Sequence, residues 1–274
     1  MKHEIYSHSR LASFEDCPKK FQYRYVLRVA SEIESIEGFL GKRVHEVLER
    51  LYRFTSSGRI PSLGRVLERF RIWWDEHYDP QRVRIARSEN DAAHYRQLGE
   101  RCLTNYYRRF YPFEDDETLA VEKRFTFSLD EEGAYRIRGV IDRVVRARDG
   151  AIEIQDYKTS QRLPSQEQLD KDRQLALYQM GIAEHFGCNH AVRLVWHYLL
   201  PNQVRTSSRS PEQLEALRGE TIGLIDRIRA ETRFEARPGP LCPWCEFDEI
   251  CPANPARRAR APEPPPPGPR YETW

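Results

Sequence analysis

Two short stretches near the middle of the chain carry the side chains best suited to bind a divalent cation. They are Gly139-Val140-Ile141-Asp142-Arg143 and Ile154-Gln155-Asp156-Tyr157-Lys158-Thr159. Because alternate residues of a strand share a face, Asp156 and Lys158 should point the same way. A carboxylate and an ammonium at the end of an apolar strand face are costly unless they are paired or functional.

The loop between these stretches decides whether the two aspartates meet. A two-residue turn at Asp149-Gly150 would set Asp142 opposite Tyr157 and place the aspartates on different faces. A three-residue loop, Arg148-Asp149-Gly150, with Gly150 left-handed in a bulge, shifts the register by one residue and sets Asp142 opposite Asp156. We expect the second register, because a shared cation site requires it.

Two carboxylates on neighbouring strands suit a hard cation, Mg²⁺ or Mn²⁺. Such a cation can polarise a phosphodiester and lower the pKa of a bound water. Lys158 would then position the water or stabilise the charge that develops on the phosphate. The alternative is a structural ion network in which Asp142 and Asp156 pair with Arg143 and Lys158, since charged pairs on strands are common.

Three further side chains could complete the site. His45 lies at the edge of the apolar stripe of a helix expected over 38–55 and could be a further ligand, although a single histidine is more often structural. Gln174 and Tyr178 are four residues apart on a helix expected over about 165–186, so they share a face. They could bracket a phosphate or a catalytic group.

A second constellation consists of cysteines. Cys242, Cys245 and Cys251 lie within ten residues, and Cys17, followed by Pro18, is the best candidate for a fourth ligand. Four thiolates can hold either zinc or a [4Fe–4S] cluster, and the spacing does not separate the two. The remaining two cysteines, Cys102 and Cys188, are expected to be buried thiols.

The elements that would position these residues follow from hydrophobic periodicity. A short helix capped by Ser9 should precede Cys17, and helix-like sequence rich in arginine and aromatics fills 63–111. Three strands are expected from about 119, over 135–146 and over 151–158, and a fourth over about 191–199. Ser210-Pro211 should open a last helix that runs to about 233. Trp73, Trp74, Tyr106 and Tyr107 are candidates for base stacking, but we expect them to form helix core.

The composition is that of a globular protein of 274 residues with a net charge of +2, so a basic DNA-binding surface must be local. No run of about 18 apolar residues indicates a membrane span, and the first residues lack the apolar core of a signal peptide. We therefore expect a cytoplasmic protein without a membrane partner.

These motifs, in this order, resemble the PD-(D/E)XK nuclease superfamily, and within it the RecB-like exonucleases, which include the AddB-type nuclease domain and the CRISPR-associated Cas4 proteins. The resemblance rests on residues 9–21 around Cys17, Gly41 to Leu48 around His45, the two acidic stretches, Gln174 to Tyr178, and the C-terminal cysteine triad. It covers residues 9–251.

The resemblance implies an α/β fold with a central mixed sheet flanked by helices, like that of restriction endonucleases. It implies Mg²⁺- or Mn²⁺-dependent hydrolysis of DNA, with His45, Asp142, Asp156 and the Tyr157 carbonyl as ligands and Lys158 as the catalytic lysine. Gln174 and Tyr178 match its Q-x-x-x-Y motif. It implies a [4Fe–4S] cluster, in place of zinc, on the four cysteines. Glu122 is only a secondary candidate for the site.

The domain organisation expected on this basis has four parts. They are an N-terminal segment over 1–37 with the first cluster cysteine, a nuclease core over 38–235 with a helical insertion at about 56–115, a cluster segment over 236–253, and a proline-rich, disordered tail over 254–274.

Three functions compete: an exonuclease for single-stranded DNA or DNA ends in repair or recombination, alone or with a helicase; a Cas4-like end-processing factor that works with CRISPR adaptation proteins; and a non-catalytic iron–sulfur scaffold that binds DNA.

Overall fold

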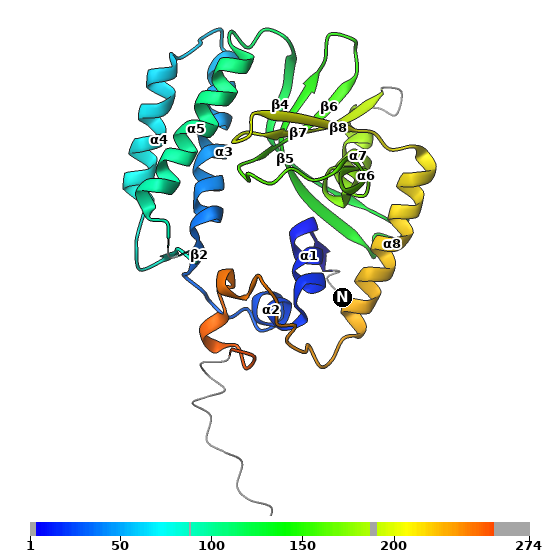
Figure 1. The fold of residues 1–274 in the computed structure, drawn as a ribbon. Helices are drawn as coiled ribbons and strands as arrows, with labels where there is room; N and C mark the ends of the chain where they lie inside the picture. The colour runs from blue at the N-terminus through cyan, green and yellow to red at the C-terminus, as the bar shows by residue number, and fades with distance from the viewer. Residues whose placement is uncertain (1–3, 88, 187–190, 255–274) are drawn as a thin grey trace, which may run out of the picture.

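The structure is a computed structural model that describes residues 4–87, 89–186 and 191–254. Its centre is a mixed six-stranded sheet (Figure 1). The strands are β1 (Ile5–Tyr6), β4 (Glu117–Ser128), β5 (Arg136–Arg146), β6 (Ile152–Lys158), β7 (Val192–Tyr198) and β8 (Gln203–Ser207). The mixed sheet flanked by helices confirms the expected fold class.

Strand β5 organises the sheet because it pairs along both of its edges. Antiparallel β4 covers one edge along its length. On the other edge, β1 pairs only with residues 136–137 and β6 only with residues 143–146. The edge between these two partners, residues 138–142, is therefore left open for side chains from elsewhere.

Helices cover both faces of the sheet and enclose two separate cores (Figure 1). One face is covered by α1 (His8–Asp16), α7 (Arg173–Phe186) and α8 (Pro211–Ala230), with the short α6 (Gln166–Asp170) at its edge. The other face is covered by α3 (Ile36–Thr55), α4 (Leu63–His77) and α5 (Ala92–Phe110). The functional side chains must come from the layer between these two cores.

Local signals explain where several helices begin. Ser35 caps α3, and Ser210 with Gln213 forms a capping box at α8, ahead of the expected Pro211 at the first helical position. The cap of α1 is Ser7 and not Ser9, because the Ser7 hydroxyl accepts the Arg10 amide. The expected helix over 165–186 is divided into α6 and α7. Strands β1 and β8 had not been expected, since each is short and lacks clear alternation.

The two ends of the described chain meet below the sheet. The N-terminal part continues through α2 (Pro18–Phe21) and a π-helical turn (Gln22–Val26), and the C-terminal part ends in two 3₁₀ turns (Cys242–Trp244 and Asp248–Ile250). Glu246 binds both Lys20 and Arg24. A parallel pair of β2 (Glu34–Ser35) and β3 (Val83–Arg84) lies beside them, and Arg84 donates to the Cys245 carbonyl at 3.1 Å.

The helical layer α4–β3–α5 occupies the range expected for a helical insertion. The expected proline-rich tail, apart from residue 254, lies outside the described residues. A search of the described helices finds none that is long and apolar enough to span a membrane.

Candidate metal centre and active site

The hairpin between β5 and β6 has the register that a shared site requires. Ala147 pairs with Ala151 around the three-residue loop, and Gly150 is left-handed with φ of +83°. Arg143 lies opposite Gln155. The expected three-residue loop and its register are therefore confirmed.

The ladder stops one step before the two aspartates would pair. Instead, the Asp142 carboxylate accepts the backbone N–H of Tyr157 at 2.8 Å. Asp142 and Asp156 thus lie where β5 and β6 separate, at the open edge of β5. Burial raises the pKa of Asp142, but His45 and the Tyr157 amide outweigh it, and the net pKa is below the ordinary value.

His45 reaches this point from α3, on the other side of the sheet. Its Nδ1 lies 3.3 Å from an Asp142 oxygen, and its Nε2 lies 2.9 Å from the Tyr157 carbonyl. Both ring nitrogens therefore face acceptors, which only a doubly protonated imidazole satisfies. Burial lowers the pKa of His45, but the carboxylates of Asp142 and Asp156 outweigh burial and raise it to about 9.

Glu122 reaches the same point from β4, the strand on the other edge of β5. It lies between two paired positions of the ladder, Val121 with Arg143 and Lys123 with Ile141, and so across from Asp142. Its φ of +48° is unusual for a side chain inside a strand. Burial and the Asp142 carboxylate raise the pKa of Glu122 to about 7.

Ligand atoms of His45, Glu122 and Asp142 all lie within 4.8 Å of one another, and this is the one such group found among the described residues. Ligands around Mg²⁺, at about 2.1 Å from it, lie roughly 3–4 Å apart, so the group needs little movement to surround one cation. The raised pKa values of His45 and Glu122 agree with this. Without a cation, protons on these two side chains offset the negative charge of the site, and a bound cation would take over that role. One imidazole and two carboxylates fit Mg²⁺ or Mn²⁺.

Asp156 belongs to an adjoining network and not to this compact group. Its carboxylate binds Lys158 Nζ at 2.7 Å and accepts the Gln174 amide at 3.0 Å. The Gln174 carbonyl accepts Lys158 Nζ at 3.0 Å, so the three side chains form a closed ring. Burial and Asp142 raise the pKa of Asp156 to about 6 against the opposing effect of Lys158.

Tyr178 stands behind this ring. Gln174 donates to its hydroxyl at 3.5 Å, and its aromatic ring packs edge-on against Phe125. Gly139 makes the arrangement possible, because a Cβ there would lie 2.6 Å from Tyr178 and 2.5 Å from Phe125. Tyr178 thus supports Gln174, while Gln174 touches both Asp156 and Lys158.

The structural ion network considered for Asp142 and Asp156 is present only in part. Lys158 pairs with Asp156, but Arg143 points to the opposite face, where it donates to Thr118 and Gln155 and lies 3.7 Å from the centre of the Tyr52 ring. The stacking candidates Trp74, Tyr106 and Tyr107 are buried helix core, as expected. Trp73 is only partly buried.

From the amino-acid sequence alone, Glu122 was only a secondary candidate. The useful signal would have been the register of β4 against β5, in which Glu122 falls opposite Asp142. That register depends on the five-residue loop between Leu129 and Tyr135, in which Asp130 accepts the Tyr135 amide and Gly133 is left-handed with φ of +75°.

The four cluster cysteines line one cavity of about 330 Å³ between the two ends of the chain. The Arg237 and Gly239 amides donate to the sulfurs of Cys17 and Cys242 at 3.4 and 3.3 Å. All five described cysteines are free thiols, and Cys102 is buried in the helical core, as expected. Cys188 lies outside the described residues.

The arrangement of these sulfurs bears on the choice of metal. A tetrahedral zinc site would hold its sulfurs about 3.8 Å apart, given bonds of about 2.3 Å. In the described part of the chain, no three cysteine sulfurs lie within 4.8 Å of one another. A wider cavity with amide donors aimed at sulfur fits a cluster better than it fits a single zinc ion.

Comparisons with known proteins identify a family and a shared fold. The family model of the PD-(D/E)XK nuclease superfamily matches residues 5–252. A solved structure named "Putative exonuclease", from Eubacterium rectale, is 13% identical to this chain, with a TM-score of 0.54. The match covers 96% of this chain and 90% of that structure's chain, and it shows a shared fold. The structure of SSO0001 has a TM-score of 0.38 at 14% identity, covering 93% and 88% of the two chains, too distant to support an argument.

No curated protein matches the chain in sequence. The family match nevertheless spans both the metal-binding group and the Asp156–Lys158 ring. The chain belongs to the PD-(D/E)XK nuclease superfamily.

Proposed function

We propose that this nuclease is a Mg²⁺- or Mn²⁺-dependent exonuclease that hydrolyses single-stranded DNA or DNA ends. The observation that carries the proposal is that two groups lie close enough to interact electrostatically: a cation-binding triad of His45, Glu122 and Asp142, and a lysine held beside Asp156. The resemblance to RecB-like exonucleases supports a role in repair or recombination.

Each residue has a part that its contacts suggest. His45, Asp142 and Glu122 would hold the cation, the Tyr157 carbonyl lies beside His45 as a further ligand, and Asp156 would have to turn from Lys158 to join them. A bound cation supplies Lewis-acid polarisation of the phosphodiester and lowers the pKa of a water. Lys158 stays protonated, because Asp156 raises its pKa against the effect of burial, and its ammonium can stabilise charge on the phosphate.

A nucleic-acid substrate is supported by the surface that leads away from Asp142. Arg136, Arg138 and Val140 alternate with the buried Ile137 and Ile141, so they share an exposed face of β5 that runs along the strand up to Asp142. The partners of this face on β4 include Arg124 beside Val140 and Thr126 beside Arg138. We call Arg124, Arg136 and Arg138 the arginine track.

The arginine track is exposed, and within the described residues none of its guanidinium groups forms an ion pair. Arg136 lies six positions before Asp142 along β5, which corresponds to about 20 Å. A row of unpaired arginines of this length that starts at the catalytic carboxylates suits a sugar–phosphate backbone.

We also propose that the four cysteines hold a [4Fe–4S] cluster with a structural role. The cluster would join segments about 220 residues apart, and closing a long loop removes unfolded-state entropy. It would hold the N- and C-terminal elements beside the nuclease core.

The test is cleavage of end-labelled single-stranded DNA by anaerobically purified protein with Mn²⁺. An Asp156→Ala/Lys158→Ala variant is the control, with Mn²⁺ binding and folding measured alongside. Degradation by the wild type alone supports the proposal, and the product ladder gives the polarity. A folded, Mn²⁺-binding wild type that leaves every DNA form intact would contradict it and favour a DNA-binding scaffold.

A further inference from the structure

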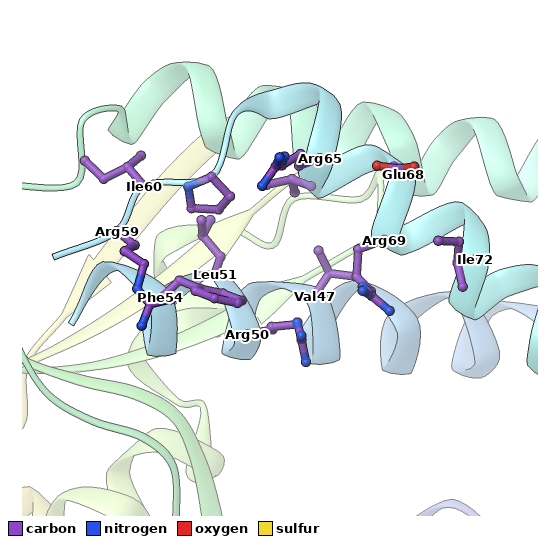
Figure 2. Close-up of a pocket in the computed structure, with 12 residues that line it drawn as sticks. Val47, Arg50, Leu51, Phe54, Arg59, Ile60, Arg65, Glu68, Arg69 and Ile72 are labelled. Carbon is purple, nitrogen blue, oxygen red and sulfur yellow. The ribbon is translucent and has the colours of Figure 1, made fainter. Parts of the chain in front are cut away.

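A second hollow lies between α3 and α4, on the outer side of the helical layer (Figure 2). It has a volume of about 470 Å³ and an aliphatic floor that includes Val47, Leu51 and Val66. Four arginines surround this floor: Arg50 from α3, Arg59 from the connection, and Arg65 and Arg69 from α4. We call this feature the arginine groove.

Two of the four guanidinium groups of the groove lie over aromatic rings. Arg50 lies over the rings of Phe54 and Trp73, at 5.3 and 6.0 Å, and Arg69 lies 5.6 Å from the Trp73 ring. Within the described residues, none of the four arginines forms an ion pair. Cation–π contacts fix a guanidinium while leaving its N–H edges free to bind carboxylates or phosphates.

The groove is separate from the nuclease site. His45 and Arg50 are both on α3, but five residues correspond to a rotation of about 140° around a helix, so they project from opposite sides. A nucleic-acid strand in the active site would have to pass around α3 to reach the groove. The floor is also mainly aliphatic, and the face of its one ring, Phe54, is covered by Arg50, whereas base binding uses open aromatic faces.

The dimensions match a peptide. Val47 and Phe54 mark two turns of α3, about 10 Å, and Arg65 and Ile72 mark the same length of α4 beside it (Figure 2). A groove between two helices with apolar floor and charged rim is suited to one face of an amphipathic segment. The chain's own residues 255–274 are a poor match, because they contain four arginines and only two glutamates.

We infer that the arginine groove docks an acidic amphipathic segment of a partner protein, with large apolar side chains on the floor and Asp or Glu on the four guanidiniums. This inference does not depend on the proposed DNA substrate, because no groove residue belongs to the nuclease site. A partner bound here would leave the arginine track and the metal-binding triad accessible.

The test is selection from a random 12-residue peptide library on the wild-type protein, with removal of peptides that also bind an Arg65→Glu/Arg69→Glu variant. We expect the survivors to be enriched in Asp or Glu together with Leu, Ile or Phe. A synthesised survivor should bind the groove variant at least tenfold more weakly than the wild type. It should bind the matched variant Arg101→Glu/Arg108→Glu, on the exposed face of α5, as tightly as the wild type.

Three results would overturn the inference. Survivors without acidic enrichment would remove the role of the arginines. Weaker binding of a single-stranded oligonucleotide by the groove variant, but not by the α5 variant, would assign the groove to nucleic acid. Self-association of the wild type that the groove substitutions abolish would assign it to a second copy of the chain. Unchanged nuclease activity of the groove variant distinguishes all of these from a failure of the nuclease proposal.

Discussion

Glu122 lies across the β4–β5 pair from Asp142, and its backbone is left-handed, with φ of +48°, inside a strand. A residue other than glycine in this conformation costs on the order of 1–3 kcal/mol and persists only where its surroundings impose it. Here the conformation brings the Glu122 carboxylate next to the side chains of Asp142 and His45, which are also charged. The strained backbone of Glu122 therefore lies at the candidate metal site, where it adds a third ligand.

Replacing this carboxylate should have opposite effects with and without a cation. Glu122→Gln removes repulsion from Asp142, so at pH 8 the metal-free protein should be stabilised by about 2 kcal/mol, while the affinity for Mn²⁺ should fall roughly tenfold. Thermal unfolding in chelator and calorimetric titration with Mn²⁺ measure the two effects. Glu220→Gln, on the exposed surface of α8, is the control and should change neither.

The stabilisation should depend on pH with a definite sign. Burial and Asp142 raise the pKa of Glu122 from 4.5 to about 7, so the folded metal-free protein binds this proton more tightly than the unfolded chain. The contribution of Glu122 to stability is complete below pH 4.5 and is lost as the pH rises to about 7. The gain from Glu122→Gln should therefore disappear near pH 4.5, and a gain of equal size at pH 4.5 and pH 8 would contradict this account.

Much of this site could be predicted from sequence because it depends on local rules. Strand alternation places Asp156 and Lys158 on one face, and the loop ending at Gly150 fixes the register toward Asp142. The contribution of Glu122 could not be predicted in the same way. It depends on a third strand, a longer connection and a backbone conformation that no propensity favours, and so on tertiary structure.

Lys158 should matter for turnover and not for cation binding. Lys158→Ala should lower the single-turnover cleavage rate at least about 100-fold, because a charge that stabilises the reacting phosphate is lost, and leave Mn²⁺ affinity within about threefold. Gln174→Ala should cost less, about tenfold, since Gln174 only orients Lys158 and Asp156. Lys171→Ala removes an exposed lysine elsewhere and should cleave normally. Wild-type rates in Lys158→Ala would exclude a catalytic role.

The arginine track should act through charge on the DNA backbone. Arg136→Ala/Arg138→Ala should weaken binding of single-stranded DNA and lower the slope of log affinity against log salt concentration by about 1.4, at roughly 0.7 per lost contact. Fluorescence anisotropy over a range of salt concentrations measures this slope. The matched pair Arg101→Ala/Arg108→Ala should leave it unchanged. An unaltered slope in the track variant would show that DNA takes another path.

The cysteine cluster should contribute stability more than chemistry. Cys17→Ser or Cys245→Ser should abolish the cluster absorbance and lower the melting temperature by roughly 10 °C, as expected for losing a cross-link worth about 3–5 kcal/mol. DNA binding should fall with stability. Cys102→Ala, in the helical core, should keep the absorbance. Wild-type melting temperatures in both serine variants, despite confirmed loss of the cluster, would refute the structural role.

Helix α3 carries His45 toward the metal-binding triad and Arg50 toward the arginine groove. The two residues are about 7.5 Å apart along one continuous helix. Because α3 is one continuous helix, the positions of His45 and Arg50 relative to each other are set by its backbone. A partner in the groove and a cation in the metal-binding triad would both contact this helix, so the Mn²⁺ affinity measured with and without a groove-binding peptide tests whether the two sites are coupled.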